Sequence, residues 1–174
     1  RLFLITKELS ETRRNEILAE VEQGAAALIA PPAEGASPIA AWLPEATSDV
    51  VSPRRNDSDF LLLGTIEFSH PIFQPFAHPK YGDFTKIHFW RSRKLELKED
   101  AEAKVIARFD NGDPAIIEKR IGKGYLFVFA AGWRPEDSEL ALSTKFVPIM
   151  TGIADLALGG AEAAPEIRVG EAMS

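Results

Sequence analysis

The fold is decided by residues 104–133, KVIARFDNGDPAIIEKRIGKGYLFVFAAGW. Three apolar-rich segments are separated there by residues typical of tight turns, which predicts three consecutive strands. We expect Asn111-Gly112 to supply positive φ angles for a two-residue hairpin, and the GKG segment at 122–124 to supply a second reversal. The third strand, 125–130, is apolar at nearly every position, as is typical of a strand covered on both faces. The stretch predicts an antiparallel meander that builds a core.

Upstream of this meander, strand and helix patterns alternate. Residues 2–6, LFLIT, and residues 25–30, AAALIA, are short apolar runs typical of buried strands. Between them, Ser10 can cap a helix over 11–23 that has a modest apolar stripe and ends at Gly24. This order predicts one βαβ unit with a right-handed crossover.

The rest of the chain gives less regular patterns. Residues 37–43 predict a short helix, 52–59 a polar loop, and 86–97 a strand with a bulge near Ser92. Residues 145–158 carry apolar side chains at helical spacing and predict the clearest amphipathic helix. Together, these strand and helix patterns predict an α/β domain over residues 1–158 with a mixed sheet, followed by a linker over 159–174 toward a further domain. Because the chain enters a strand at once, we expect the domain to be N-terminally truncated.

Composition excludes several classes of function. The net charge of −6 argues against a nucleic-acid-binding role, because a backbone binder needs a positive field. The two basic groups, Arg13-Arg14 and RSRK at 91–94, are interpreted as solvated surface. The chain has no cysteine, which removes disulfides, thiolate metal ligands and thiol nucleophiles. No apolar run reaches the roughly 18 residues that span a bilayer.

Signatures of metal and catalytic sites are missing from the sequence. The spacing of His70, His78 and His88 matches no ligand pattern, and the first two are interpreted as turn residues. The nucleophile elbow, the phosphate loop and the dinucleotide fingerprint do not occur. A Ser/His/Asp triad stays open, because its members can lie far apart in sequence. We expect no catalytic residues, no metal and no cofactor.

The loop after strand 125–130 holds the candidate ligand-binding residues. If that strand is parallel to its core neighbours, its carboxyl end lies where α/β proteins hold their ligands. A solvated loop leading to the last helix is the alternative. The candidates are Trp133, Arg134, Asp137 and Glu139.

Three stretches carry a resemblance to a known family. Residues 61–84, LLLGTIEFSHPIFQPFAHPKYGDF, combine a Gly, an acidic residue, His-Pro-aliphatic-Phe, Pro-Phe and an aromatic near Asp-Phe. Residues 105–133 and the Phe-x-Pro helix at 146–156 extend the pattern. Together they resemble the glutamine-amidotransferase-like domain of large bacterial membrane proteins, which also carry an aerotolerance-regulator-type N-terminal region and a von Willebrand factor A domain.

The resemblance implies a flavodoxin-like fold, a three-layer α/β sandwich. Working amidotransferases of this class need a cysteine nucleophile and a late His-x-Glu pair, and this chain has neither a cysteine nor a histidine after His88. It therefore implies a non-catalytic module on the extracytoplasmic (periplasmic) side of a membrane-anchored protein, with a structural or protein-interaction role. Its partner would be another protein or other domains of the same chain.

The alternative is a hydrolase or small-ligand-binding domain that uses the loop after strand 125–130. A concave pocket with convergent polar groups at residues 133–139 would favour this alternative. A flat, filled strand end would favour the interaction module.

Overall fold

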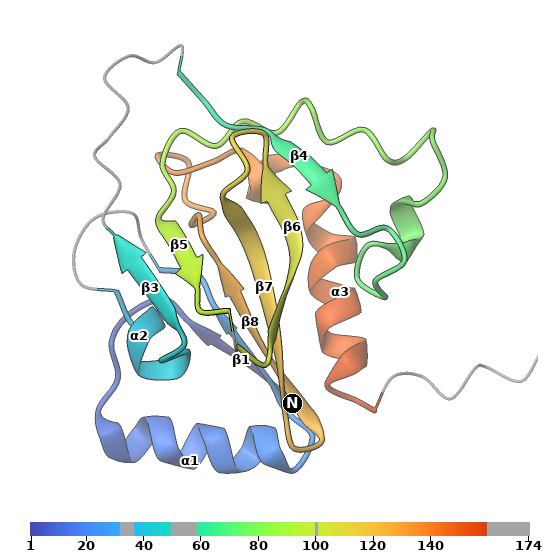
Figure 1. Cartoon of the computed structure of the whole chain (residues 1–174). Helices are drawn as coiled ribbons and strands as arrows, with labels where there is room; N and C mark the ends of the chain where they lie inside the picture. The colour runs from blue at the N-terminus through green and yellow to red at the C-terminus, as the bar shows by residue number, and fades with distance from the viewer. Residues whose placement is uncertain (32–36, 50–58, 100, 160–174) are drawn as a thin grey trace, which may run out of the picture.

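The computed structural model describes residues 1–31, 37–49, 59–99 and 101–159. Its centre is a six-stranded mixed sheet in the order β1-β2-β8-β7-β6-β4, beside a two-stranded antiparallel sheet of β3 and β5 (Figure 1). The strands are β1 (Leu2–Ile5), β2 (Ala26–Ile29), β3 (Ala46–Asp49), β4 (Leu63–Ile66), β5 (Lys94–Leu97), β6 (Ala103–Phe109), β7 (Pro114–Ile121) and β8 (Gly124–Phe129). The helices are α1 (Glu11–Glu22), α2 (Ile39–Trp42) and α3 (Phe146–Leu156), with 3-10 turns η1 (Gln74–Phe76) and η2 (Leu140–Leu142).

The first unit of the chain is the predicted β1-α1-β2 unit. The Ser10 side chain accepts a hydrogen bond from Arg13 N at 3.3 Å and caps α1, as expected. Ile17 and Val21 bury one face of this helix. β1 and β2 are parallel, in the register Leu2↔Ala26 to Ile5↔Ile29.

The meander is confirmed as β6, β7 and β8, which pair antiparallel in sequence order. The first turn differs from the expectation: four residues separate β6 from β7, and only Gly112 has a positive φ, of 89°. The second turn has two residues between the paired Ile121 and Gly124, and Gly122 takes a φ of 59°. The sequence therefore predicted both reversals, but not the loop length of the first.

The pairing of β8 with β2 determines where a site can lie. These strands are parallel, with Ala27 opposite Leu126 and Ile29 opposite Val128. Gly124 permits a close approach at the start of β8, because a Cβ there would lie 2.1 Å from Ala25 O. β1, β2 and β8 thus run in the same direction, and their carboxyl ends meet at one edge of the sheet.

The strand expected over 86–97 is shorter than predicted. Only Lys94–Leu97 is a strand, β5, and it joins β3 instead of the main sheet. The residues before it hydrogen-bond to the loop after β8: Trp90 N and Arg91 N donate to Asp137 O, and Arg93 N donates to Ala130 O. These backbone bonds with a distant loop replace a regular strand ladder.

The mixed α/β fold with its antiparallel meander is confirmed, whereas the flavodoxin-like three-layer arrangement stays a prediction. Among the described residues, two α-helices exceed one turn, α1 and α3, and both pack against β2. Most of the loop expected at 52–59 and of the linker expected at 159–174 lies outside the described residues. No helix in the described ranges has the length and apolarity needed to cross a membrane.

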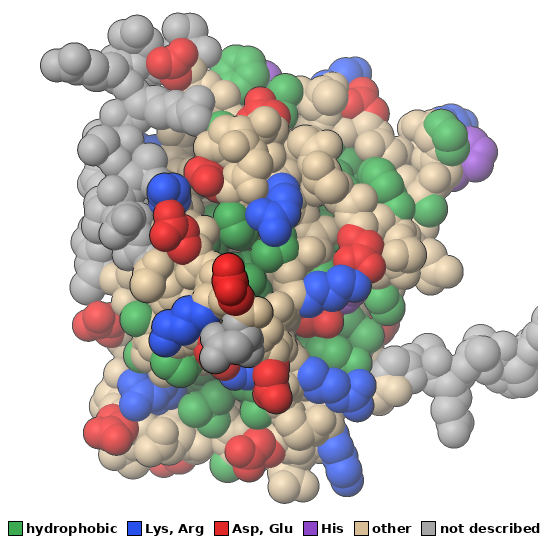
Figure 2. Space-filling model, viewed as in Figure 1, with side chains coloured by type: hydrophobic (Ala, Val, Ile, Leu, Met, Phe, Trp, Pro, Cys, Tyr) green, Lys and Arg blue, Asp and Glu red, His purple; other side chains and the backbone are tan. Residues whose placement is uncertain are grey.

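Charged side chains of both signs are interspersed on the face of the molecule shown in Figure 2. This face carries no broad single-sign field of the kind that binds a nucleic-acid backbone.

Candidate functional site

A small cavity lies at the shared carboxyl edge of the three parallel strands. Thr6 follows β1, Ala30 follows β2, and the loop after β8 supplies the rest of the lining. Its volume is about 130 Å³. We call it the strand-end cavity, and its lining residues are Thr6, Ala30, Gly132, Trp133, Arg134 and Asp137.

Backbone hydrogen bonds fix the loop that places Asp137 in the wall. Asp137 N and Ser138 N both donate to Arg134 O, at 2.8 and 3.0 Å, and close a tight turn. The Ser138 hydroxyl donates to Gly132 O at 2.8 Å, while Trp90 N donates to Asp137 O at 3.0 Å. The Asp137 carboxylate is therefore held by a rigid backbone, and its side chain is 1% exposed.

Glycine at position 132 makes room for this carboxylate. A Cβ at Gly132 would lie 2.6 Å from Asp137 Oδ2 and 3.3 Å from Pro31 O. The first distance is shorter than any ordinary contact, so a side chain here would displace the carboxylate. Gly132 is thus part of the geometry of the cavity.

Two guanidinium groups accompany Asp137. Arg93 is 1% exposed; burial lowers its pKa, and the nearby Asp137 carboxylate partly offsets this effect. Arg134 lies at the surface, with Nε 3.7 Å from Asp137 Oδ2 and 3.9 Å from Glu136 Oε2. The buried carboxylate is therefore balanced by one buried and one exposed cation.

The structure brings three of the four predicted candidates together. Trp133, Arg134 and Asp137 line the strand-end cavity, and the indole of Trp133 packs edge-on against Phe146 at 5.6 Å between ring centroids. Glu139 does not line the cavity. Its carboxylate lies 2.8 Å from His88 Nδ1 and also accepts a hydrogen bond from His88 N.

Sequence reasoning missed four residues at or beside the cavity, Thr6, Ala30, Gly132 and Arg93. Thr6 and Ala30 follow β1 and β2, so the strand-end rule that selected the loop after β8 could have found them. Arg93 was included in the basic group at 91–94, and the expectation that this group is solvated surface is wrong for it. Its burial depends on Asp137, a partner distant in sequence, so no local pattern indicates it.

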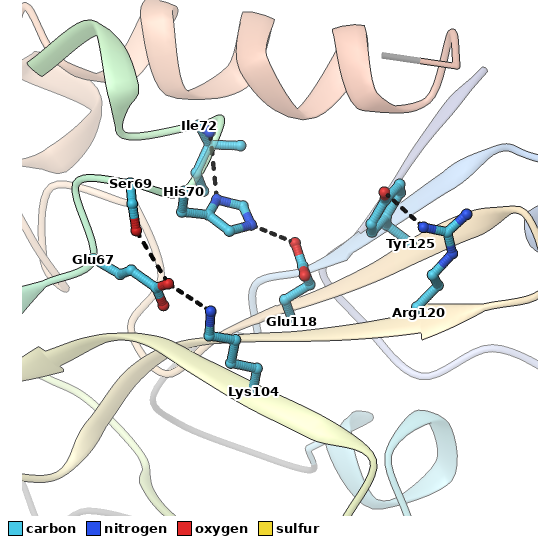
Figure 3. Close-up of polar contacts among 8 residues, drawn as sticks. All are labelled: Glu67, Ser69, His70, Ile72, Lys104, Glu118, Arg120 and Tyr125. Atoms are coloured by element: carbon cyan, nitrogen blue, oxygen red, sulfur yellow. Dashed lines mark hydrogen bonds and ion pairs between the residues drawn. The ribbon is translucent and has the colours of Figure 1, made fainter.

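The histidines lie outside the strand-end cavity. His70 Nδ1 accepts from Ile72 N at 3.3 Å, which leaves Nε2 to donate to Glu118 Oε2 at 2.6 Å (Figure 3). His78 Nδ1 accepts from Lys80 N at 3.2 Å. Both are turn residues bonded to backbone, as predicted. In the described part of the chain, no three His, Cys, Asp or Glu side chains converge as metal ligands would.

Four of the lining residues carry polar side chains, Thr6, Trp133, Arg134 and Asp137. Both carboxylate oxygens of Asp137 are fully buried. A nucleophile needs a base within hydrogen-bond reach, and the described lining residues include no Ser, Cys or His. The nearby Ser138 hydroxyl is buried and already donates to Gly132 O.

Comparisons with known proteins show the fold alone. No protein-family model and no curated protein sequence matches the chain. The cytoplasmic protein STM3548 from Salmonella typhimurium has a TM-score of 0.63 at 11% identity, over 88% of this chain and 70% of that one. The cytoplasmic protein STM1381 from Salmonella typhimurium LT2 has a TM-score of 0.55 at 18% identity, over 87% and 62%.

A β-galactosidase from Rahnella sp. R3 is also similar, with a TM-score of 0.58 at 14% identity. The match covers 88% of this chain but spans only 22% of the β-galactosidase. The shared fold is therefore one part of a much longer enzyme.

The expected extracytoplasmic (periplasmic) location is wrong on these comparisons. Two of the similar structures are described as cytoplasmic proteins. The expectation came from the family resemblance alone, and the fold gives it no support.

Proposed function

We propose that this chain is a non-catalytic α/β module, related to the amidotransferase-like domains of flavodoxin-like fold, that works by binding. The observation that carries this proposal is the composition of the strand-end cavity. It lies at the carboxyl ends of parallel strands, where α/β proteins hold ligands, yet its described lining includes no serine, cysteine or histidine.

Turnover assays test the non-catalytic half of the proposal. Purified protein incubated with millimolar glutamine, or with an activated ester, should release no ammonia and no alcohol above the blank. Product formation that the Thr6→Ala variant abolishes would contradict it, because Thr6 carries the hydroxyl that lines the cavity.

Two binding roles fit a non-catalytic module: contact with another protein or domain, and recognition of a small molecule. The concave strand end favours the second role. A filled edge would leave no room for a ligand, whereas a cavity of about 130 Å³ with a carboxylate in its wall can hold one.

The volume of the strand-end cavity limits the size of that ligand. Pockets for drug-sized molecules occupy roughly 300–1,000 Å³, so this cavity accepts only a small molecule or one end of a larger one. Ligand-observed NMR with a library of small polar compounds should therefore reveal binders that wild type holds and Gly132→Ala does not. A library without any such binder would leave protein contact as the better role.

A further inference from the structure

One edge of the main sheet is open and apolar. Among the described strands, β1 pairs with β2 alone, so its other side is a sheet edge (Figure 1). Leu4 is 54% exposed there, and Leu2 and Phe3 are half-buried. The helices α1 and α3 pack chiefly against β2 and β8, inward of this edge. The side chain of Leu4 is therefore left in solvent where the sheet ends.

The backbone of β1 alternates between β2 and the open edge. Ile5 O accepts a hydrogen bond from Ala30 N at 3.0 Å, so the backbone of Ile5 is directed to the β2 side. Successive residues of a strand direct their N–H and C=O groups to opposite sides. Leu2 and Leu4 therefore present both backbone groups to the open edge, in the arrangement that accepts another strand.

The opposite edge of the same sheet is protected, whereas the β1 edge is not. The ladder of β4 with β6 is irregular between Leu63 and Thr65, and the exposed residues there are Gly64 and Thr65. Bulges, prolines and charged side chains are the usual means by which an edge strand avoids pairing with another chain. Residues 2–5, LFLI, include neither a proline nor a charge, and their ladder with β2 is regular. This difference favours pairing as a role of β1.

A second copy of the chain fits this edge. When two antiparallel strands are related by a two-fold axis perpendicular to the sheet, each residue lies opposite one on the same face. An axis at Leu4 places this leucine against Leu4 of the partner subunit, and Phe3 against the partner's Ile5. The outward N–H and C=O groups of Leu4 then exchange hydrogen bonds with the same groups of the second copy. The exposed leucine is thereby buried against its own symmetry mate.

The charges that flank β1 suit the same arrangement. At the start of the strand, Arg1 Nη1 lies 2.6 Å from Glu20 Oε1, and the exposed Lys7 and Glu8 follow its end. With the axis at Leu4, Arg1 lies opposite Lys7 of the partner subunit. Glu20 and the partner's Glu8 accompany them, so each end of the paired strands holds two cations and two carboxylates. This balance favours a second copy over a partner that carries charge of one sign.

We propose that the β1 edge joins two copies of this chain through an antiparallel β1–β1 pair, which makes one continuous sheet of their two six-stranded sheets. The inference does not depend on the strand-end cavity and goes beyond its proposed function. The paired strands are short, so the contact lies at the small end of protein interfaces. The dimer should therefore form in a concentration-dependent manner.

Sedimentation equilibrium of the full chain over a concentration series tests this pairing. We expect the mean mass to rise from 19.1 kDa toward twice this value. Leu4→Lys and Leu4→Glu each place like charges face to face at the axis, and each should weaken association about tenfold or more. An equal mixture of these two variants should restore association, because a lysine then faces a glutamate. Leu142→Lys changes a leucine that is 75% exposed on η2, and this control should associate as wild type does.

Hydrogen exchange of the Leu4 amide gives a second readout that needs no variant, because its protection should increase with protein concentration. A wild type that stays monomeric up to about 1 mM would overturn the proposal. Dimers that Leu4→Lys and Leu142→Lys form equally well would also overturn it, because the contact would then lie elsewhere. So would a monomer with a protected Leu4 amide, since another part of the same chain would then cover the edge.

Discussion

Arg93 and Asp137 form the charged centre of the strand-end region. Both are almost fully buried, and each comes from a different irregular segment of the chain. Burial lowers the pKa of Arg93, so the Asp137 carboxylate is needed to keep that cation favourable. Arg134, which shares the carboxylate, stays 58% exposed. At the residue scale the two arginines therefore differ. Arg93 stabilises the fold, whereas Arg134 lies at the entrance of the cavity.

We therefore expect substitutions of Arg93 and Arg134 to lower the free energy of unfolding by different amounts. Arg93→Met leaves Asp137 buried without its internal cation and should lower the free energy of unfolding by about 3–5 kcal/mol. Arg134→Gln removes an exposed ion pair and should cost less than about 1 kcal/mol. Urea denaturation of the two variants measures both values. Equal losses of unfolding free energy in the two variants would show that Arg93 does not compensate the buried Asp137 carboxylate.

A second residue-scale prediction concerns Gly132. Gly132→Ala places a methyl group 2.6 Å from Asp137 Oδ2, and should destabilise the fold by about 1–3 kcal/mol while displacing the carboxylate from the cavity wall. Thermal unfolding measures the stability, and Ala141→Ser, which adds one atom to an exposed residue, is the control. An unchanged unfolding temperature in Gly132→Ala would mean that the carboxylate does not occupy this position.

The ion pair of Glu45 and Lys119 predicts a pH dependence. Burial raises the pKa of Glu45, but the hydrogen bond and charge of Lys119 bring it below its ordinary value. A lowered carboxyl pKa stabilises the fold above the ordinary value of 4.5 and loses that contribution as the pH falls. Lys119→Met should therefore lower the free energy of unfolding by about 1–3 kcal/mol at pH 7. This loss should shrink as the pH falls from 4.5 through the lowered pKa of Glu45.

Urea denaturation at pH 7 and at low pH measures this difference, and Lys123→Met at the exposed hairpin is the control. A pH-independent cost for Lys119→Met would indicate that the Lys119 side chain acts through packing instead of charge.

The residues of the cavity were only partly predictable from sequence. Trp133, Arg134 and Asp137 follow an apolar strand, and the strand-end rule selects such residues once the strand is parallel. Glu139 satisfied the same rule, but the chain turns after Ser138 and directs its carboxylate to His88. Arg93 gave no local signal, because charged residues in a polar segment usually lie at the surface.

At the element scale, turn chemistry and periodicity were the reliable signals. Glycine reversals and dense apolar runs predicted β6, β7 and β8, and helical spacing predicted α3. Residues 88–93 were less predictable because His88, Trp90, Arg91 and Arg93 hydrogen-bond to the loop after β8, while Phe89 pairs with Leu61. An alternating pattern cannot reveal pairing with an irregular partner. Elements that depend on local sequence were therefore predicted, whereas elements that depend on contacts with distant segments were not.

Two side-chain pairs link the loop after β4 to the main sheet. His70 donates to Glu118 on β7 at 2.6 Å, while Glu67 pairs with Lys104 on β6 (Figure 3). The Glu118 side chain is 15% exposed, so losing its partner should cost about 1–3 kcal/mol. A double-mutant cycle of His70→Ala and Glu118→Gln, followed by urea denaturation, should give a coupling energy above about 0.5 kcal/mol.

The exposed pair of Glu67 and Lys104 provides the matched comparison. Lys104 is 58% exposed, so the cycle of Glu67→Gln and Lys104→Met should give a coupling energy near zero to about 1 kcal/mol. Additive effects at His70 and Glu118 would mean that the buried contact contributes nothing specific.

At the scale of the whole molecule, the sheet has a parallel half and an antiparallel half. The parallel strands β1, β2 and β8 present their carboxyl ends to the strand-end cavity, while the antiparallel β7, β6 and β4 complete the core. The similar solved structures share this scaffold at identities of 18% or less, so the chemistry of this chain must be inferred from its own residues. The proposal of binding without turnover rests on those residues.

One measurement tests binding without turnover most directly. Protein and a binder from the small-molecule library are combined in the NMR tube, and the Trp133 indole signal is followed to saturation. The ligand is then recovered by dialysis and analysed by mass spectrometry. We expect a saturable and reversible shift with chemically unchanged ligand. A shift accompanied by a converted product, or a Trp133 signal that never moves, would contradict it.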